Sequence, residues 1–311
     1  MKIIILGGSG YIGSLLSKIL LSKNHKIKVI DTFWFGKKIQ KHKNLKIVKK
    51  DIRNLNKNDL IGYDTIIHLA NIANDPSVEL NPKLSWDVNV LASIRLCELA
   101  RLAKIKKIIY SSSGSVYGIS NKKKVTEETE LHPLSVYNKT KMTAEKIFLS
   151  YSNEFKIVII RPATVCGNSE RLRLDVSVNM LTYQAWKFKV ITVMGGKQIR
   201  PNIHIRDLCN IFQFFLTKNI SGIFNAGFEN LSILKIAKKI QTKTKCKIKI
   251  IKSNDPRSYK LNSDKILRIG YKQKNNVEKA INELLFYFEK TKYKASSINY
   301  NIKRSKILKI K

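Results

Sequence analysis

The sequence predicts an α/β fold in which a parallel, doubly wound sheet is followed by a smaller α/β lobe. Two observations support this prediction. In the first half of the chain, short apolar runs alternate with helical patterns, which is typical of a parallel sheet with helices between its strands. After about Cys166 the alternation becomes less regular, which indicates a second lobe. The chain has 311 residues, 43% of them hydrophobic, so it is long enough to bury such a core.

The first half contains six predicted strands and three predicted helices. Each strand is a short run rich in β-branched residues, and each helix repeats apolar side chains at intervals of three or four, as Ile12, Leu15 and Leu16 do. The strands are expected at residues 2–6, 27–30, 45–48, 65–69, 107–111 and 157–161, and the helices at residues 11–22, 82–103 and 135–152.

The second half has fewer regular elements. Helices are expected at residues 175–187, 206–216, 233–242 and 277–290, and strands at residues 190–193, 223–226 and 247–251. We expect a first domain of residues 1–165 and a second lobe formed mainly by residues 166–311, with the possibility that some later segments rejoin the first sheet.

The net charge of +37 raises the question of a polyanionic partner, such as nucleic acid or an anionic membrane surface. The 59 basic residues comprise 48 lysines and 11 arginines, scattered along the chain. Specific nucleic-acid sites favour arginine for bidentate contacts. We therefore interpret the charge as a lysine-rich, solvated surface and expect no specific nucleic-acid site. The basic residues 303–311 are interpreted as a frayed terminus, or else as a weak contact for an anionic surface.

Other classes of site are not expected. No apolar run approaches the roughly 18 residues that a membrane span requires, and the first residues do not have the pattern of a signal peptide. The cysteines at positions 97, 166, 209 and 246 have no CxxC spacing and fit a reduced, cytoplasmic location. No metal site is predicted.

Residues 7–13, Gly-Gly-Ser-Gly-Tyr-Ile-Gly, lie between the first predicted strand and the first predicted helix. Glycine allows the backbone to turn sharply and to approach a diphosphate without a Cβ clash, and the helix N-terminus presents free N–H groups. This spacing directly after a strand is typical of a dinucleotide-binding loop. The first domain is therefore expected to be of the Rossmann type.

Two acidic residues follow the next strands. Asp31 ends the second strand, where a carboxylate can bind both ribose hydroxyls of NAD and repel the 2′-phosphate of NADP. NAD is therefore favoured, although Lys37 and Lys38 lie nearby. Asp51, followed by Ile52, either contacts the adenine amine or serves as a turn residue.

Tyr137 and Lys141 are four residues apart, so on a helix they project from one face. A positive charge beside a phenol favours the phenolate and lowers the pKa of the phenol towards the range useful for proton transfer. The same spacing recurs at Tyr183 and Lys187, but no serine-rich strand end precedes that pair, and we interpret Tyr183 as a surface or packing residue.

In combination these features resemble the extended short-chain dehydrogenase/reductase family, in its NAD-dependent sugar-nucleotide epimerase/dehydratase branch. The resemblance extends to about residue 290. The matching segments occur in the expected order: residues 7–13, Asp31, Asp51, Leu69-Ala70, Asn89, the serine-rich residues 111–118, Tyr137 to Lys141, Arg161-Pro162, residues 200–207 and residues 255–259.

The resemblance implies NAD as cofactor and a three-residue catalytic set. Tyr137 would remove a proton from a sugar hydroxyl that Ser113 holds, and Lys141 would bind the nicotinamide ribose and keep Tyr137 ionised. NAD would take hydride from the same carbon, usually C4. The implied cofactor contacts are Gly7, Gly10, Tyr11, Ile12, Gly13, Asp31, Asp51, Ile52, Leu69, Ala70, Asn89, Tyr137, Lys141 and Pro162.

The implied substrate is a nucleotide-diphosphate sugar bound largely by the second lobe. Arg200 and Arg257 match positions that contact the diphosphate in this family, a task that suits the bidentate guanidinium. Asn168, Arg171 and Arg173 are expected to line the sugar pocket.

The residues beside Ser113 restrict the reaction. Dehydratases and decarboxylases of the family usually carry an acid there, whereas this chain has Gly114 and Ser115. Cys166 replaces a common tyrosine and is interpreted as a packing residue. A 4-epimerase is favoured, and a 4-dehydrogenase that releases a 4-keto hexose or heptose is the alternative. A non-catalytic NAD-sensing or RNA-associated protein of the same fold is the alternative of another class.

The family also commonly dimerises through a four-helix bundle. The predicted helices at residues 82–103 and 135–152 would each contribute once per subunit, so a homodimer is expected.

Overall fold

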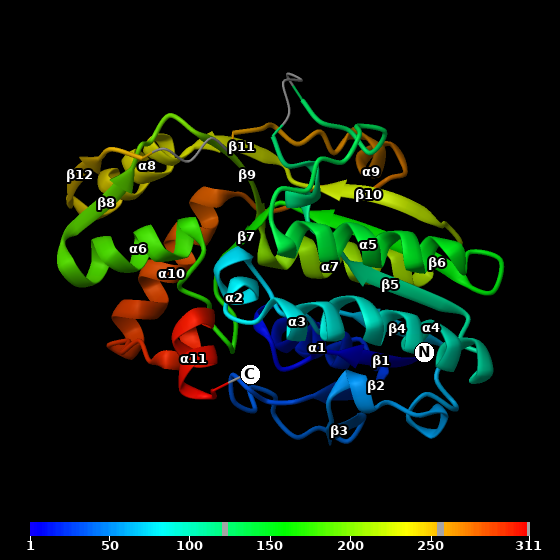
Figure 1. The fold of residues 1–311 in the computed structure, drawn as a ribbon. Helices are drawn as coiled ribbons and strands as arrows, with labels where there is room; N and C mark the ends of the chain where they lie inside the picture. Colours follow the sequence, from blue (N-terminus) through cyan, green and yellow to red (C-terminus); the bar gives the residue numbers. More distant parts are fainter. Residues whose placement is uncertain (120–123, 254–257, 310–311) are drawn as a thin grey trace.

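A seven-stranded parallel sheet forms the centre of the computed structural model, which describes residues 1–119, 124–253 and 258–309 (Figure 1). Its strand order is β10-β6-β5-β4-β1-β2-β3, so the chain winds outward from β1 in both directions. The strands are β1 (Lys2–Leu6), β2 (Lys26–Asp31), β3 (Leu45–Lys49), β4 (Thr65–His68), β5 (Lys107–Ser111), β6 (Lys156–Pro162) and β10 (Gly222–Ala226). This arrangement confirms the predicted Rossmann-type α/β fold.

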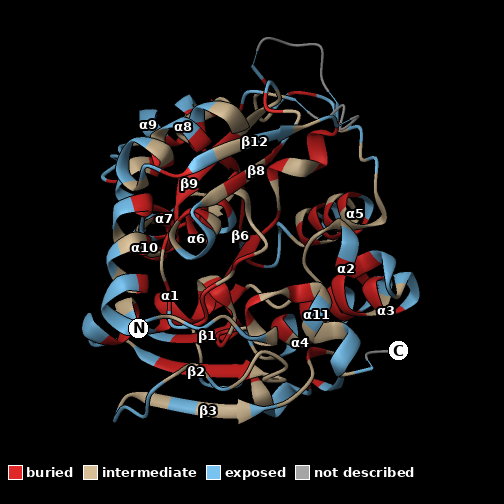
Figure 2. Ribbon diagram, turned by 90° about the vertical axis from the view of Figure 1, so that its left-hand side faces the viewer, coloured by how far each residue is buried: buried red, intermediate tan, exposed pale blue. Residues whose placement is uncertain are grey.

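Helices cover both faces of the sheet because successive side chains of a strand point to opposite sides. Ile3 and Ile5 of β1 belong to the core under α1 (Tyr11–Ser22) and α7 (Ile205–Thr217). Ile4 and Leu6 belong to the core under α4 (Ala92–Leu102) and α5 (Val136–Ser150). Figure 2 shows buried residues along β1 and β2 between these layers.

The predicted helix at residues 82–103 is continuous but not uniform. It consists of α3 (Pro82–Trp86), a π-helical turn (Asp87–Leu91) and α4. A short helix that was not predicted, α2 (Asp75–Glu79), precedes it, and the Asn74 side chain caps its N-terminus by accepting from the backbone N–H of Ser77.

Most of the second half forms a separate set of elements. The predicted ones are α6 (Ser177–Phe188), β8 (Val190–Met194), α8 (Ile233–Thr244), β12 (Lys247–Ile251) and α10 (Val277–Thr291). The structure adds a three-stranded sheet of β7 (Thr164–Cys166), β9 (Ile199–His204) and β11 (Glu229–Ser232), and the helices α9 (Asp264–Arg268) and α11 (Asn301–Ile307). Strand β10 and helix α7 return to the central sheet. The division at residues 165 and 166 stays a prediction.

Several residues singled out in the sequence have packing positions. Tyr183 is buried against Trp186 and Phe288. The Cys166 thiol is buried and donates to the carbonyl of Ile203, and burial raises its pKa. All four cysteines are unpaired.

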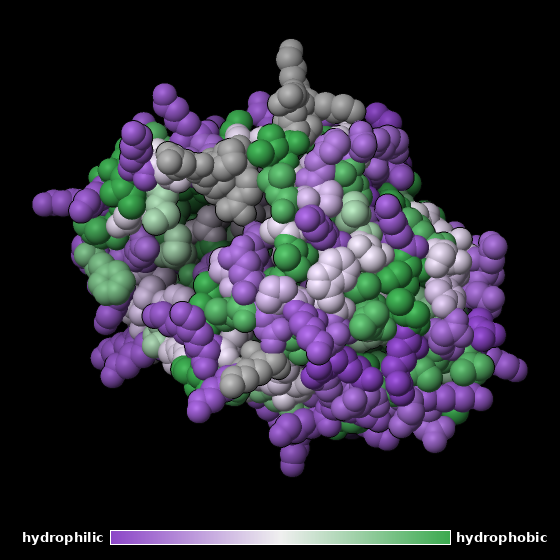
Figure 3. Space-filling view, viewed as in Figure 1, coloured by the Kyte–Doolittle hydropathy of each residue, from purple (hydrophilic) through white to green (hydrophobic). Residues whose placement is uncertain are grey.

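Within the described residues, none of the helices is long and apolar enough to cross a membrane. Hydrophilic residues are spread over the face shown in Figure 3, with hydrophobic ones between them.

Candidate active site

A cavity of about 700 Å³ opens at the carboxyl ends of the central strands, where the second lobe faces the sheet. The carboxyl edge of an open parallel sheet is where such folds bind ligands. The cavity is lined by the loops after β1, β4 and β5, by the start of α5, by the end of β6, by residues 171–184, and by Asn301 and Ser305 of α11. Segments from both halves of the chain thus share one cavity.

The loop after β1 fits a dinucleotide diphosphate. Gly7 has a φ of +80°, and a Cβ there would lie 2.5 Å from the backbone nitrogen of Ala70. A Cβ on Gly13 would lie 2.4 Å from the carbonyl oxygen of Gly7, so only glycine allows α1 to start this close to β1. No side chain caps the N-terminus of α1, which leaves N–H groups directed at the cavity for an anion.

Asp31 stands beside this loop at the end of β2. Its carboxylate accepts from the backbone N–H of Ser9 at 2.9 Å and from that of Phe33 at 2.7 Å. Burial raises the pKa of Asp31, although these hydrogen bonds and the charge of Arg171 act in the opposite direction. The carboxylate is thus held in place by the backbone of the loop.

Three other predicted cofactor residues have structural partners. The Asp51 carboxylate pairs with the Arg53 guanidinium at 2.8 Å and accepts from the Arg53 backbone, as a turn residue does. Ile52 is buried in the core. The Asn89 side chain accepts from the backbone N–H of Ile72 at 2.9 Å and so fixes the loop after β4. Of the predicted cofactor residues, those that line the cavity are Gly7, Gly10, Tyr11, Ile12, Gly13, Leu69, Tyr137, Lys141 and Pro162.

Ser113, Tyr137 and Lys141 lie together in the wall of the cavity. Helix α5 begins at Val136 because the Ser135 side chain caps it, accepting from the backbone N–H of Asn138. This start places Tyr137 in the first turn and Lys141 in the second. The Ser113 hydroxyl is 2.8 Å from the hydroxyl of Ser115.

Burial shifts the pKa values of Tyr137 and Lys141. Burial raises the pKa of Tyr137 to about 12, against the opposing effects of the Arg173 charge and of a hydrogen bond with Ser113. Lys141 directs its ammonium group to the carbonyl oxygen of Ser111, at 2.7 Å, and burial lowers its pKa to about 7. Desolvation therefore dominates the pKa of Tyr137, and the cation that opposes it is Arg173, so the predicted effect of Lys141 on the phenol stays a prediction.

A buried ion pair that the sequence analysis missed anchors α5. Glu145, one turn after Lys141, pairs with Arg161 of β6 at 2.6 Å, and both side chains are almost fully buried. Arg161 also donates to the Tyr117 hydroxyl at 2.8 Å, and Ser112 donates to Glu145. The Arg161-Pro162 motif was visible in the sequence, but its partner on another element was not.

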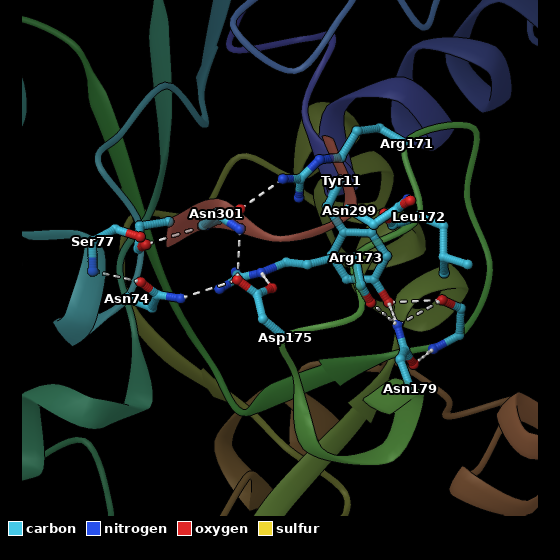
Figure 4. Close-up of polar contacts among 12 residues, drawn as sticks. Tyr11, Asn74, Ser77, Arg171, Leu172, Arg173, Asp175, Asn179, Asn299 and Asn301 are labelled. Carbon is cyan, nitrogen blue, oxygen red and sulfur yellow. Dashed lines mark hydrogen bonds and ion pairs between the residues drawn. The ribbon is translucent and has the colours of Figure 1, made fainter. Parts of the chain in front are cut away.

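Three of the predicted substrate residues, Arg171, Arg173 and Arg200, line the cavity. Asn168 is not part of its lining, and Arg257 lies outside the described residues. The guanidinium of Arg173 pairs with Asp175 at 2.6 Å. The other oxygen of Asp175 accepts from the backbone N–H of Asn301 at 2.8 Å and from the Asn74 side chain at 3.4 Å (Figure 4).

Helix α11 orders residues Asn301–Ile307 and Ser305 lines the cavity, so this part of the chain belongs to the site, in contrast to the frayed terminus predicted for residues 303–311. Asn301 begins α11, and its amide nitrogen donates to the carbonyl of Ala73 at 3.2 Å. Asn301, Asn74 and Asp175 carry no pattern in the sequence that would join them, because they are brought together only by the fold.

The space beside Ser113 is tight for a side chain at position 114. A Cβ on Gly114 would lie 3.2 Å from the carbonyl oxygen of Pro162 and 3.3 Å from the Tyr259 hydroxyl. Among the described lining residues, the carboxylates are Asp75 and Asp175. Asp75 accepts from the Ser135 hydroxyl and Asp175 is paired with Arg173. The two positions that follow Ser113 therefore provide no carboxylate, because they are Gly114 and Ser115.

Comparison with known proteins gives the family context for this geometry. Residues 3–227 match the model of a family described as the "NAD dependent epimerase/dehydratase family". An uncharacterized UDP-glucose epimerase of Bacillus subtilis (strain 168) is 34% identical over 267 residues, covering 78% of this chain and 81% of the relative. A UDP-glucose 4-epimerase of Lactobacillus helveticus is 27% identical over 275 residues, covering 77% and 82%.

A solved structure agrees with these matches over nearly the whole chain. The UDP-glucuronic acid 4-epimerase of Bacillus cereus, in a mutant form bound to UDP-4-deoxy-4-fluoro-glucuronic acid and NAD, is similar with a TM-score of 0.85 and 26% identity. The similarity covers 94% of this chain and 100% of the other.

Proposed function

Because this chain belongs to the NAD-dependent epimerase/dehydratase family, we propose that it is a 4-epimerase of a nucleotide-diphosphate sugar. The family and the relatives are NAD-dependent sugar-nucleotide enzymes, and NAD is the cofactor. The observation that carries the 4-epimerase proposal is that one cavity is shared by Ser113, Tyr137, Lys141 and the uncapped N-terminus of α1. The residues that follow Ser113 in the sequence carry no acid.

In the proposed reaction Tyr137 acts as the base and Ser113 positions the sugar. The Tyr137 phenolate takes the proton of the C4 hydroxyl and becomes a phenol, while the C4–H bond breaks and a C4 carbonyl forms. NAD, when bound, would supply the acceptor for the C4 hydride and the donor that returns it. Ser113 hydrogen-bonds the reacting oxygen, Lys141 holds the nicotinamide ribose, and the phenol gives the proton back to the C4 oxygen.

Two features favour epimerisation over the dehydratase chemistry of other family members. Elimination of water from the sugar needs an additional acid or base near the reacting carbons, and the positions next to Ser113 are Gly114 and Ser115, which supply neither. The relative that is 34% identical is named a UDP-glucose epimerase. We therefore also propose UDP-hexoses as the first substrates to test, with Arg200 and Arg257 at the substrate diphosphate.

The experiment is a turnover screen with UDP-, GDP-, CDP- and dTDP-sugars, with separation of the C4 epimers. The expected result is interconversion of two epimers without net NADH. Tyr137→Phe should lower the rate by about 10²–10⁴-fold, the contribution typical of a general base, while NAD binding changes little. Tyr183→Phe, at the second Tyr–Lys pair, is the matched control and should keep the rate.

Each other outcome has a clear meaning. Stoichiometric NADH with a keto sugar would replace the epimerase by a 4-dehydrogenase. Unchanged turnover in Tyr137→Phe would remove Tyr137 as the base. Tight, salt-sensitive RNA binding with no sugar-nucleotide turnover would favour the non-catalytic alternative.

We further propose a homodimer formed through the outer surface of α4 and α5. Leu91, Ile94 and Leu102 project from this surface with 57%, 42% and 48% of their areas exposed, an apolar stripe that pairing with a second copy would bury. Sedimentation should give a dimer, and the double variant Leu91→Glu, Ile94→Glu should give a folded monomer. A monomeric parent protein contradicts this proposal. The four unpaired thiols support a cytoplasmic location.

A further inference from the structure

Arg171 is a buried cation without a carboxylate partner of its own. The residue is only 3% exposed, and within the described chain its guanidinium makes no ion pair. One nitrogen donates to the side-chain oxygen of Asn301 at 2.6 Å, and the guanidinium carbon lies 4.1 Å from the centre of the Phe35 ring. Its Nε is buried without a hydrogen-bond partner. A buried charge is stable only when an opposite charge or hydrogen-bonding groups compensate it.

The carboxylates around Arg171 are already engaged. Asp175 attracts it but is paired with Arg173, which repels it. The charge of Arg171 acts to lower the pKa of Asp31, but the two carboxylate oxygens of Asp31 already accept hydrogen bonds from the backbone N–H groups of Ser9 and Phe33. The cluster of Arg171, Arg173 and Asp175 therefore keeps one positive charge in excess, and Arg171 also lines the cavity.

The position of Arg171 indicates which ligand would supply the missing negative charge. Its backbone N–H lies 3.4 Å from the hydroxyl of Ser14, in the first turns of α1. Phe35 and the α1 N-terminus line the same cavity. These neighbours belong to the end of the cavity formed by β1 and β2, where the loop of residues 7–13 lies. An anion bound by the N-terminus of α1 would thus also contact the guanidinium of Arg171.

We propose that Arg171 binds the diphosphate of NAD together with the N-terminus of α1, and that Asn301 of the C-terminal segment positions the guanidinium. This assignment moves Arg171 from the sugar pocket to the cofactor. Asn301 is suited to the positioning role because three of its groups are fixed: its side-chain oxygen to Arg171, its backbone N–H to Asp175 and its amide nitrogen to Ala73 (Figure 4). The inference rests on the NAD dependence in the proposed function but not on the choice of sugar reaction.

The test measures binding of ADP, adenosine, NAD and UDP to the nucleotide-free full chain by calorimetry. Arg171→Met should weaken ADP and NAD by about 10–100-fold, the range expected for lost hydrogen bonds to a charged group. Adenosine, which has no phosphate, and UDP should change by less than about twofold. Arg268→Met, the same substitution at an exposed arginine, is the control and should bind all four ligands normally.

A second variant keeps the test informative if Arg171→Met does not fold. Asn301→Asp places a carboxylate next to Arg171, so it should raise the melting temperature of the free protein while reducing the upward shift that ADP produces. Equal weakening of ADP and adenosine, unchanged ADP binding in folded Arg171→Met, or a selective loss of UDP binding would each overturn the assignment to the NAD diphosphate. The outcome is independent of sugar turnover, so it can fail without the 4-epimerase failing.

Discussion

Tyr137 illustrates how burial and charge compete for the proton of one side chain. In the free protein, burial raises the phenol pKa to about 12, and Arg173 with Ser113 opposes this effect. The Tyr–Lys spacing correctly predicts which helix face carries the two groups. The spacing cannot predict that the Lys141 ammonium donates to the carbonyl of Ser111, because Ser111 belongs to strand β5 and precedes Lys141 by 30 residues.

The role of Arg173 leads to a pH-dependent prediction. Removing its positive charge in Arg173→Met should raise the pKa of Tyr137 further, so less phenolate is present at any given pH. The rising limb of kcat against pH should therefore move to higher pH, whereas Arg173→Lys should keep the limb nearer its original place. The profiles are compared at saturating NAD and sugar nucleotide. Superimposable profiles for the parent and Arg173→Met would show that this charge does not reach the phenol.

At the scale of elements, the position of α5 depends on its ion pair with β6. Glu145 and Arg161 are buried, and Arg161 has further contacts with Tyr117. Breaking such a pair leaves an uncompensated buried charge. Since Tyr137 and Lys141 lie on the same helix, the ion pair also supports the geometry of the proposed catalytic residues.

Glu145→Gln should therefore lower the free energy of unfolding by about 3–5 kcal/mol, the range for a buried pair that loses one partner. Urea denaturation of the parent and the variant measures this difference. Lys146→Gln, at the exposed neighbouring position, should change stability by less than about 0.5 kcal/mol. A loss below about 1 kcal/mol in Glu145→Gln would mean that the pair is not an important support for α5.

The elements differ in how well the sequence predicts them. Strands β1, β2, β4, β5 and β6 are apolar runs buried on both faces, so composition alone marks them. Strand β9 contains Pro201 and Asn202 and exchanges hydrogen bonds with β7 and β11, and its pattern was not apparent before the fold was known. Helix α11 is short and lysine-rich, and what orders it is tertiary: Asn301 binds Asp175 and Ala73.

At the scale of the whole molecule, the cavity exists because distant segments meet at one edge of the sheet. The loops after β1, β4 and β5 provide the wall at the sheet, residues 171–184 provide the opposite wall, and α11 closes one end. The cofactor loop and the Ser113, Tyr137 and Lys141 set were predictable because each has a local pattern. The Arg173–Asp175 pair and its contact with Asn301 required the fold, because these residues lie on segments more than 100 positions apart.

The joining of segments from both halves of the chain at one cavity suits an enzyme that keeps its NAD between the two half-reactions. An epimerase must hold both the reduced cofactor and the keto sugar while the sugar turns, whereas a dehydrogenase must release both. Arg171 and Asn301 line the cavity together, and if Arg171 binds the NAD diphosphate as proposed, this contact would slow the departure of NAD.

The fate of the hydrogen at C4 tests this account most directly. The best sugar nucleotide from the turnover screen, deuterated at C4, is incubated with the NAD-loaded protein, and the products are analysed by mass spectrometry and NMR. If the hydride stays on bound NAD between the two half-reactions, the C4 epimer should retain the deuterium at C4 and no deuterated NADH should accumulate in solution. Deuterium released as NADH together with a 4-keto sugar, or an epimer that has lost its deuterium, would contradict this account.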